Sequence, residues 1–283
     1  MAGAEARPYK VEAQMANIEK HEAGSFCWMD LATTDQGAAK KFYGEMFGWA
    51  AKDSPMGENQ FYTMFSIDGR EVCAGYTLQE HQRKMGMGPH WMPYVATEST
   101  DASVKRAEEL GAKIIAPAFD VFDAGRMAMF EDPTGAKLCV WEAKTHVGSR
   151  IAGVAGTLCA ADLITQDQDA ASAFYEKLFG WQVRKEDEEP EHRYYHIFHN
   201  GEFIGGIPPA SYAPKGVPAH WQIYLQVANC KASEAKAKEL GARIYMPTMK
   251  VEDVGWMSVV ADPQGAGFAM FQAAAAKAVA SDK

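Results

Sequence analysis

The hydrophobic and polar positions of the chain alternate between the period of strands and the period of helices, in a fixed order. Residues 25–33 (SFCWMDLAT) are rich in aromatic and β-favouring side chains and predict a strand. The segment AAKKFYGEMF then has apolar residues at helical spacing, with Asp35 where an N-cap belongs and Gly48 as the stop. Asp68 and Gly69 lie between strand-like runs and favour a hairpin turn. The pattern therefore predicts a strand, a helix and a short antiparallel run, which is an α+β unit.

The same order recurs in the second half of the chain. Sliding the sequence against itself by 132 positions places DQGAAKKFYGEMFGW, from Asp35, on DQDAASAFYEKLFGW, from Asp167. After a two-residue slip in a surface loop, DPTGA, from Asp132, lies on DPQGA, from Asp262. Each copy also contains a weaker half-repeat, which implies four modules in all. We therefore predict two tandem copies of one domain.

The composition around the repeats sets the expected boundaries. We expect a polar N-terminal tail at residues 1–21, a first domain at 22–145, a second domain at 146–273 and a C-terminal tail at 274–283. The two domains meet at a linker around THVGSRIAG.

Charge and composition narrow the classes of partner. The chain has 28 Lys+Arg against 37 Asp+Glu, and a net charge of -9 repels the phosphates of nucleic acids and anionic lipids. No apolar run is long enough for a membrane span, and the N-terminus lacks the apolar core of a signal peptide. The five cysteines form no C-x-x-C pair. We expect a cytoplasmic protein with a small-molecule partner and no nucleic acid or membrane partner.

The motifs resemble those of a known superfamily. FYG-x-x-FGW after the first strand and DP-x-GA before the last, with the order β-α-β-β-β twice per domain, resemble the vicinal oxygen chelate superfamily of glyoxalases, bleomycin resistance proteins and extradiol dioxygenases. The first strand, WMDLAT, and the two-domain length are similar to its mycobacterial antigen-type, glyoxalase-like subgroup. The resemblance covers about residues 24–272 and implies that each domain forms a curved mixed sheet, a cup with helices outside.

In metal-using members of this superfamily, the first, fourth, fifth and eighth strands of each domain supply the metal ligands. The resemblance places the fourth-strand position within residues 73–75 and 205–207. It places the other positions on Trp28, Met92 and Cys139 in the first copy and on Ala160, Gln222 and Ala269 in the second. Divalent ions need several oxygen or imidazole ligands, which these side chains do not supply. We therefore expect no catalytic metal and no cofactor.

Polar residues share the inward face of the same strands. Side chains alternate along a strand, so those at even spacing from the ligand positions also point into the cups. They are Asp30, His90 and Tyr94 in the first copy and Asp162, His220 and Tyr224 in the second. The resemblance implies that the first and fifth strands run antiparallel with Trp28 opposite Met92, which places His90 opposite Asp30. The second copy repeats the arrangement with Asp162 and His220. Such a pair either performs acid–base chemistry or satisfies two polar groups between central strands.

Further residues are candidates for lining a ligand pocket. Arg126 and Trp256 occupy equivalent positions, so one cup is expected to offer a cation where the other offers an aromatic wall. Cys139 is interpreted as an inert thiol of the inward face. The full set of candidate ligand-binding residues is Trp28, Tyr62, Met92, Tyr94, Arg126, Cys139, Tyr194, His196, Gln222, Tyr224 and Trp256.

Three functions remain open from the sequence. The first is a protein that binds an apolar or planar small molecule in a cup, as antibiotic-sequestering relatives do. The second is a metal-independent isomerase, lyase or hydroxylase-like enzyme that uses the Asp–His pair. The third is a metal-dependent glyoxalase of the lactoylglutathione lyase type. A monomer and a homodimer are both compatible with the fusion of two domains.

Overall fold

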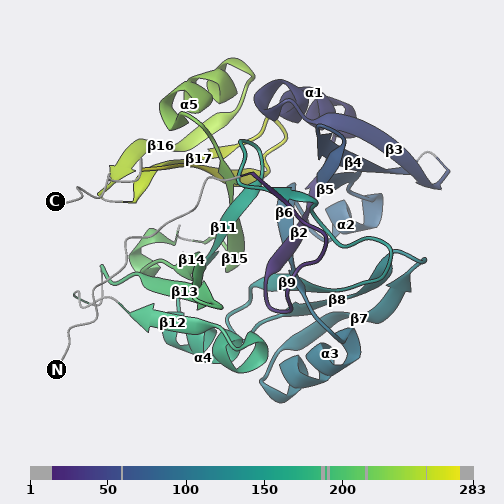
Figure 1. The fold of residues 1–283 in the computed structure, drawn as a ribbon, viewed down its shortest axis with the longest axis vertical. Helices are drawn as coiled ribbons and strands as arrows, with labels where there is room; N and C mark the ends of the chain where they lie inside the picture. The colour runs from purple at the N-terminus through teal and green to yellow at the C-terminus, as the bar shows by residue number, and fades with distance from the viewer. Residues whose placement is uncertain are drawn as a thin grey trace, which may run out of the picture.

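The protein folds into two eight-stranded sheets with helices on their outer sides, as Figure 1 shows. The structure is a computed structural model and describes residues 15–58, 60–185, 189, 192–213, 216–252 and 254–274. The elements of the first half are β2 (Phe26–Thr33), α1 (Gln36–Phe47), β3 (Ala50–Gly57), β4 (Gln60–Ile67), β5 (Arg70–Thr77), α2 (Glu80–Lys84), β6 (His90–Ala96), α3 (Thr100–Glu109), β7 (Lys113–Val121), β8 (Gly125–Glu131) and β9 (Lys137–Ala143). Those of the second half are β11 (Leu158–Ile164), α4 (Gln168–Phe179), β12 (Gln182–Lys185), β13 (Tyr195–His199), β14 (Glu202–Ile207), η1 (Ala210–Tyr212), β15 (His220–Gln226), α5 (Cys230–Glu239), β16 (Arg243–Val251), β17 (Gly255–Ala261) and β18 (Gly267–Ala273). The predicted α+β fold with two tandem copies is confirmed.

Each sheet consists of two β-α-β-β-β modules that meet at a central antiparallel strand pair. The first sheet has the order β3-β4-β5-β2-β6-β9-β8-β7, and the second has the matching order β12-β13-β14-β11-β15-β18-β17-β16. β2 runs antiparallel to β6, while β2 and β5 form one parallel pair and β6 and β9 form another. Every second side chain of the four central strands therefore lies on one shared face, and the candidate site is on that face.

Helix ends and hairpin turns form where their sequence signals predict them. Asp35 Oδ1 accepts a hydrogen bond of 2.9 Å from the Ala38 amide at the start of α1, and Gly48 ends the helix with φ 71°. Asp167 and Gly180 cap α4 in the same way. The Asp68-Gly69 turn joins β4 to β5 with both residues at positive φ. Asn200 and Gly201 form the equivalent turn in the second sheet, also at positive φ.

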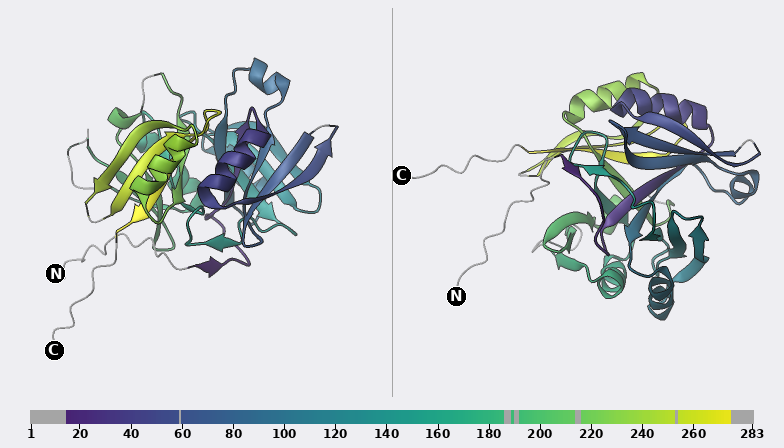
Figure 2. Two further views of the ribbon diagram at one scale, coloured as in Figure 1. Left: turned by 90° about the horizontal axis from the view of Figure 1, so that it is seen from above. Right: turned by 45° about the vertical axis from the view of Figure 1, so that its right-hand side comes forward.

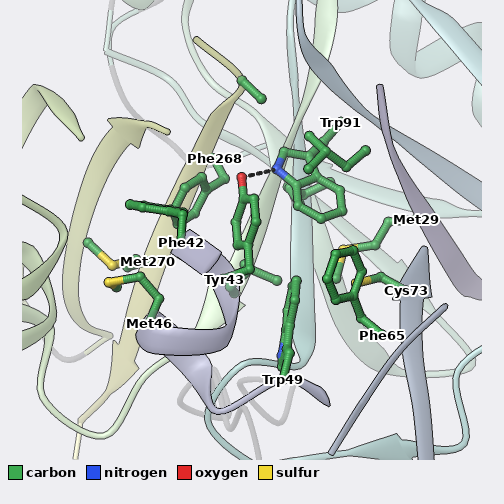
Figure 3. Packing of buried hydrophobic residues seen from close by; sticks show 14 of the residues in the cluster. Met29, Phe42, Tyr43, Met46, Trp49, Phe65, Cys73, Trp91, Phe268 and Met270 are labelled. Atoms are coloured by element: carbon green, nitrogen blue, oxygen red, sulfur yellow. Dashed lines mark hydrogen bonds between the residues drawn. The ribbon is translucent and has the colours of Figure 1, made fainter. Parts of the chain in front are cut away.

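The two hydrophobic cores that support the sheets are each shared between the two halves of the chain. In one core, Met29 and Phe42 from the first half pack with Leu225 and Phe268 from the second. Figure 3 shows this core, with Tyr43 and Trp49 beside Phe268 and Trp91. The other core combines the remaining modules in the same way. Helices α1 and α5 accordingly lie side by side, as do α3 and α4, each pair taking one helix from each half (Figure 2).

Hydrogen bonds also connect the two halves of the chain, in the same reciprocal manner as the cores. The Trp49 indole nitrogen donates to the carbonyl of Gly156, just before β11, at 3.2 Å. The equivalent Trp181 donates to the carbonyl of Gly24, just before β2, at 2.7 Å. The tryptophan of each FGW motif therefore binds the backbone that leads into the first long strand of the other half.

The segment before the first sheet also contacts the linker. The short strand β1 (Ala16–Asn17) pairs antiparallel with β10 (Ile151–Ala152). Part of the expected tail at residues 1–21 is thus joined to the segment between the sheets. Residues 1–14 and 275–283, which cover most of the two expected tails, lie outside the described residues.

Candidate functional site

The candidate site is the sheet face turned away from the helices, which we call cup 1 in the first sheet and cup 2 in the second. Cup 1 is lined by Trp28, Asp30, Tyr62, Met64, Ala74, Met92, Tyr94, Met127, Met129, Cys139 and Trp141. Cup 2 is lined by Ala160, Asp162, Tyr194, His196, Gly206, Gln222, Tyr224, Met257, Val259, Ala269 and Phe271. Aromatic, sulfur and aliphatic groups thus surround one carboxylate in each cup.

In cup 1 the buried carboxylate of Asp30 accepts three hydrogen bonds from side chains of three strands. Tyr62 donates to Oδ1 at 2.6 Å, and the Trp28 indole nitrogen donates to the same oxygen at 3.0 Å. Tyr94 donates to Oδ2 at 2.7 Å. Because Asp30 is 5% exposed, these donors replace the water that the carboxylate loses on folding.

Cup 2 repeats this arrangement with a different third donor. Tyr194 donates to Oδ1 of Asp162 at 2.6 Å, and Tyr224 donates to Oδ2 at 2.8 Å. Ala160 stands where cup 1 has Trp28, and the third hydrogen bond comes from the Gly206 amide at 2.9 Å. A Cβ atom on Gly206 would lie 2.3 Å from the Tyr194 ring, so the glycine makes room for that ring. Both cups therefore keep an aspartate between two tyrosines.

Burial and hydrogen bonding act in opposite directions on these carboxyl groups. Burial raises the pKa of Asp30, and the hydrogen bonds from Tyr62, Tyr94 and Trp28 offset part of the rise. Burial likewise raises the pKa of Asp162. Burial and then the charge of Asp30 raise the pKa values of Tyr62 and Tyr94 well above their ordinary range, so both phenols stay protonated donors.

The predicted pairing of Asp30 with His90 is wrong, because the strand register differs by two residues from the one expected. β2 and β6 place Trp28 opposite Tyr94 and Asp30 opposite Met92, while His90 lies opposite Ala32. His90 Nδ1 donates to the Gly88 carbonyl at 2.8 Å, and burial lowers its pKa. A shift of two residues keeps the same side chains on the cup face, so the predicted parity holds although the partners change.

The same correction applies to Asp162 and His220. Asp162 lies opposite Gln222, and His220 lies opposite Ile164 at the end of the strand pair. The Nδ1 atom of His220 donates to the carbonyl of Pro218 at 2.9 Å. Among the described residues, the side chains that bond to either buried aspartate are tyrosines and one tryptophan.

Arg126 and Trp256 do not line the cups, which corrects a second prediction. On β8, Ala128 and Phe130 belong to a core under the helices, and Arg126 shares their face by strand alternation. Its guanidinium donates to both carboxylate oxygens of Asp101 in α3, at 2.9 and 3.0 Å. Trp256 packs against the corresponding core on the helix side of β17.

Several other predicted residues do line the cups. Met92 is 7% exposed, and Gln222 is 9% exposed opposite Asp162. His196 is 8% exposed and lies beside Tyr194, with ring centroids 4.7 Å apart. Cys139 is fully buried opposite Tyr94, and burial raises the pKa of its thiol, which keeps it protonated.

The side chains at the expected metal-ligand positions do not fit a divalent ion. Trp28, Met92 and Ala74 supply no oxygen or imidazole, and the buried thiol of Cys139 is held protonated. The described part of the chain contains no group of three or more His, Cys, Asp or Glu side chains placed to hold a metal ion. Asp30 and Asp162 are each bonded to hydroxyl donors instead.

His146 is a cup residue that the sequence analysis missed. It lies after β9, in the segment between the sheets, and its ring meets that of Trp28 edge-on with centroids 4.6 Å apart. Its Nδ1 lies 3.3 Å from Oε2 of Glu71, and its Nε2 is buried with no partner among the described residues. The hydrogen bond to His146 is the main cause that lowers the pKa of Glu71. No periodicity marks this residue, because it belongs to an irregular segment.

Comparison with known proteins identifies the family. The model of the glyoxalase/bleomycin resistance protein/dioxygenase superfamily matches residues 25–140, and the model of the glyoxalase-like domain matches residues 159–271. The chain belongs to this glyoxalase superfamily. The resemblance drawn from the sequence is thereby confirmed.

Relatives of similar length carry two kinds of name within the superfamily. The chain is 36% identical over 264 residues to "Putative glyoxylase CFP32" of Mycobacterium tuberculosis, covering 92% of this chain and 99% of the relative. It is 31% identical over 280 residues to the anthracycline biosynthesis protein DauV of Streptomyces sp. strain C5, covering 92% and 97%. These names describe the relatives.

Solved structures of the superfamily share the fold at low sequence identity. The Mn(II)-bound glyoxalase of Novosphingobium aromaticivorans has a TM-score of 0.62 at 16% identity, covering 88% of this chain and 82% of that chain. The 2,2',3-trihydroxybiphenyl 1,2-dioxygenase of Sphingomonas wittichii has a TM-score of 0.61 at 12% identity, covering 89% and 91%. Within the described residues, no helix has the length and apolar character needed to cross a membrane.

Proposed function

We propose that this glyoxalase-superfamily protein binds a planar, largely apolar small molecule in a cup, against the carboxylate held by two tyrosines. The observation that carries the proposal is the repetition of the Asp–Tyr–Tyr group in both cups. The third donor differs between them, since it is Trp28 in cup 1 and the Gly206 amide in cup 2. Burying a carboxylate is costly unless every oxygen is bonded, and the chain meets that requirement twice.

The walls of the cups suit a flat aromatic ligand. Met64, Met127 and Met129 are half-buried around cup 1, and thioether groups adapt to the shape of an aromatic ring and attract it. Tyr62 is also half-buried and presents a ring beside its bonded hydroxyl. A mostly apolar wall with a few fixed polar groups is typical of small-molecule sites.

The name of one relative supports a polycyclic aromatic class. DauV is named for anthracycline biosynthesis, and anthracyclines are flat, fused-ring compounds that carry hydroxyl and quinone oxygens. Such a ligand offers an extended apolar face to the methionines and polar edges to the hydroxyls around Asp30. The proposal therefore extends to hydroxylated, fused-ring aromatic compounds.

Titration with a dihydroxyanthraquinone tests the proposal. Cup 1 contains Trp28 and Trp141, so saturable quenching of tryptophan fluorescence is expected on binding. Met127 and Met257 are equivalent residues of the two cups, and each is half-buried. Met127→Ala is expected to weaken binding about tenfold if cup 1 is used, and Met257→Ala if cup 2 is used, since either change removes an apolar contact surface. No saturable binding up to about 0.1 mM, a weak affinity, would overturn the proposal.

A second candidate function is metal-independent proton transfer, and His146 is the observation that favours it. A carboxylate that bonds Nδ1 orients an imidazole and leaves Nε2 as a base, which is the arrangement of Glu71 and His146 beside Trp28. Hydrogen–deuterium exchange at the enolisable carbon of 2-tetralone, followed by NMR, tests this function. The protein is expected to accelerate exchange, and His146→Gln is expected to abolish the acceleration. Exchange that is no faster with the protein than without it would count against the candidate.

A further inference from the structure

A cavity of about 430 Å³ lies at one end of the second sheet, apart from the groups that bond Asp162. The loop after β15, the strands β17 and β18 and the linker form its walls, and it is open to solvent. Gly153, Gln226, Val227, Trp256, Gln272 and Ala273 line it. Its volume falls within the range of small-molecule sites, which runs from about 300 to 1,000 Å³.

Two polar groups on the wall of this cavity lack partners among the described residues. Gln226 is 8% exposed. Its side-chain nitrogen donates a hydrogen bond of 3.5 Å to the carbonyl oxygen of Gly153, which fixes the orientation of the amide. The Oε1 atom of Gln226 is buried and has no described donor. A buried amide oxygen without a donor costs about 1–3 kcal/mol, so the site favours a ligand that supplies one.

Trp256 supplies the second unpartnered group. Each of the other six tryptophan indole nitrogens donates to a described acceptor, such as Asp30 for Trp28 and the Gly156 carbonyl for Trp49. The indole N–H of Trp256 has no acceptor in the part of the chain that the structure describes. Its half-buried ring also gives the cavity an aromatic wall.

In the first half of the chain, an arginine side chain fills the place that is equivalent to this cavity. There Arg126 stands in the position of Trp256, and its guanidinium bonds to Asp101 and to the carbonyl of Ala118. Ala96 of the first half is equivalent to Gln226 of the second half. Lys231, in α5 of the second half, is equivalent to Asp101 of the first half. The second half thus replaces an internally satisfied ion pair with an indole N–H and an amide oxygen that both lack described partners.

We propose that this cavity is a second binding site, for a small planar molecule whose polar group both donates and accepts hydrogen bonds, such as a phenol. The ring of the ligand packs on Trp256. Its hydroxyl donates to Oε1 of Gln226 and accepts from the indole N–H of Trp256. The site is independent of the cups, because none of the groups that hold Asp30 or Asp162 lines it.

Titration of the full chain with 2-naphthol, followed by NMR of the tryptophan indole N–H signals, tests the site. The Trp256 signal is expected to shift in a saturable manner, and binding in cup 1 would instead be reported by Trp28. Gln226→Ala, which copies Ala96 of the first half, is expected to weaken 2-naphthol binding about tenfold through loss of one hydrogen bond. Naphthalene, which has no hydroxyl, is expected to bind both proteins equally weakly. An unmoved Trp256 signal at about 1 mM 2-naphthol, or equal affinity in the Gln226→Ala protein, would overturn the proposal.

A double variant gives an independent arm. Trp256→Arg together with Lys231→Asp rebuilds the ion pair that Arg126 and Asp101 form, so the protein is expected to keep its thermal transition and lose 2-naphthol binding at this place. Retained binding in that variant contradicts the site. A shorter chain that ends at Ala274 is expected to bind as the full chain does. If 2-naphthol binds at Trp256 only in the shorter chain, residues 275–283 block the cavity in the full chain and the proposal is wrong.

Discussion

The hydroxyl of Tyr43, in α1, donates a 3.0 Å hydrogen bond to Oδ2 of Asp262, in the turn before the last strand of the other half. The other oxygen of Asp262 accepts the backbone amides of its own turn, from residues 264 to 266. Tyr43 in turn accepts a hydrogen bond of 3.1 Å from the Trp91 indole. In the equivalent bond, the hydroxyl of Tyr175, from the second half, donates to Oδ2 of Asp132, from the first half, at 2.9 Å. The FY-x-x-x-FGW motif of each half therefore bonds to the DP-x-GA motif of the other half.

Removing either hydroxyl should destabilise the whole protein. Tyr43→Phe leaves Oδ2 of Asp262 without its donor in a buried position, and a hydrogen bond to a carboxylate is worth about 1.5–3 kcal/mol. Tyr175→Phe removes the equivalent bond and serves as the matched variant. Both are expected to lower the free energy of unfolding by about 2 kcal/mol in urea titrations. A change below about 0.5 kcal/mol in both proteins would show that these bonds contribute little.

The two halves should not fold independently. Each main core takes side chains from both halves, so a chain of residues 1–145 exposes one face of each core to water. We expect that chain and the chain of residues 146–283 to be unfolded or aggregated alone and to form a folded complex when produced together. Circular dichroism and size-exclusion chromatography distinguish these states. A cooperative thermal transition of either half as a monomer would contradict the shared cores.

Asp30 should make stability depend on pH in a defined direction. Burial raises its pKa above the ordinary 3.8, so the folded protein holds the proton more tightly than the unfolded chain. The stabilisation from Asp30 is present below the pKa that its carboxyl has in the unfolded chain. It is lost as the pH rises through the raised pKa of the folded protein. Asn at this position does not titrate. The advantage of the wild type over Asp30→Asn, measured by urea unfolding, should therefore shrink as the pH rises above the ordinary carboxyl value of 3.8.

Asp68 provides the control for that measurement, because its side chain is 82% exposed on a hairpin turn. Asp68→Asn is measured under the same conditions, and the change seen with Asp30→Asn is compared with it. An advantage over Asp30→Asn that grows with pH would mean that the hydrogen bonds from Tyr62 and Tyr94 outweigh burial.

Gly206 should be intolerant of even a small side chain. In Gly206→Ala the added methyl would lie 2.3 Å from the Tyr194 ring, which has to leave Asp162 to make room. We expect a loss of about 1–3 kcal/mol in unfolding free energy, as for other overpacked interiors. Cup 1 already has Ala74 in the equivalent place, so Ala74→Gly is the matched control and should cost less. Equal costs for the two changes would argue against the steric role of Gly206.

Metal content should be low in the purified protein. The side chains at the expected ligand positions do not fit a divalent ion, so elemental analysis is expected to find zinc, nickel, iron and manganese well below one equivalent. Dialysis against EDTA should leave dihydroxyanthraquinone binding unchanged. One equivalent of any of these metals, lost together with binding, would contradict the assignment of the cup residues.

Local sequence signals predicted much of the fold because each depends on a few neighbouring residues. The N-cap at Asp35, the helix stop at Gly48 and the turn at Asp68 are set by local backbone chemistry. The alternation of strand side chains correctly assigned Asp30 and Tyr94 to one face. That face is where the candidate site lies.

Features that depend on distant contacts were not predictable in the same way. Period-two alternation fixes a face but not a register, so Asp30 was expected opposite His90 rather than Met92. The assignment of Arg126 to a cup failed because its equivalence with Trp256 in the repeat does not fix the face of β8 on which it lies. His146 reaches Trp28 from an irregular segment that carries no pattern. The apolar face of a helix also does not indicate which sheet it will cover. Nothing in the sequence therefore indicated that each core takes side chains from both halves of the chain.

The exchange of cores has a consequence for the protein during its synthesis. When the first half leaves the ribosome, Met29 and Phe42 are available, but Leu225 and Phe268, which complete their core, have not yet been translated. At about 5–20 residues per second, the nascent chain waits on the order of ten seconds for them. Its apolar helix faces stay exposed for that time, and the fold closes only once the final strands emerge.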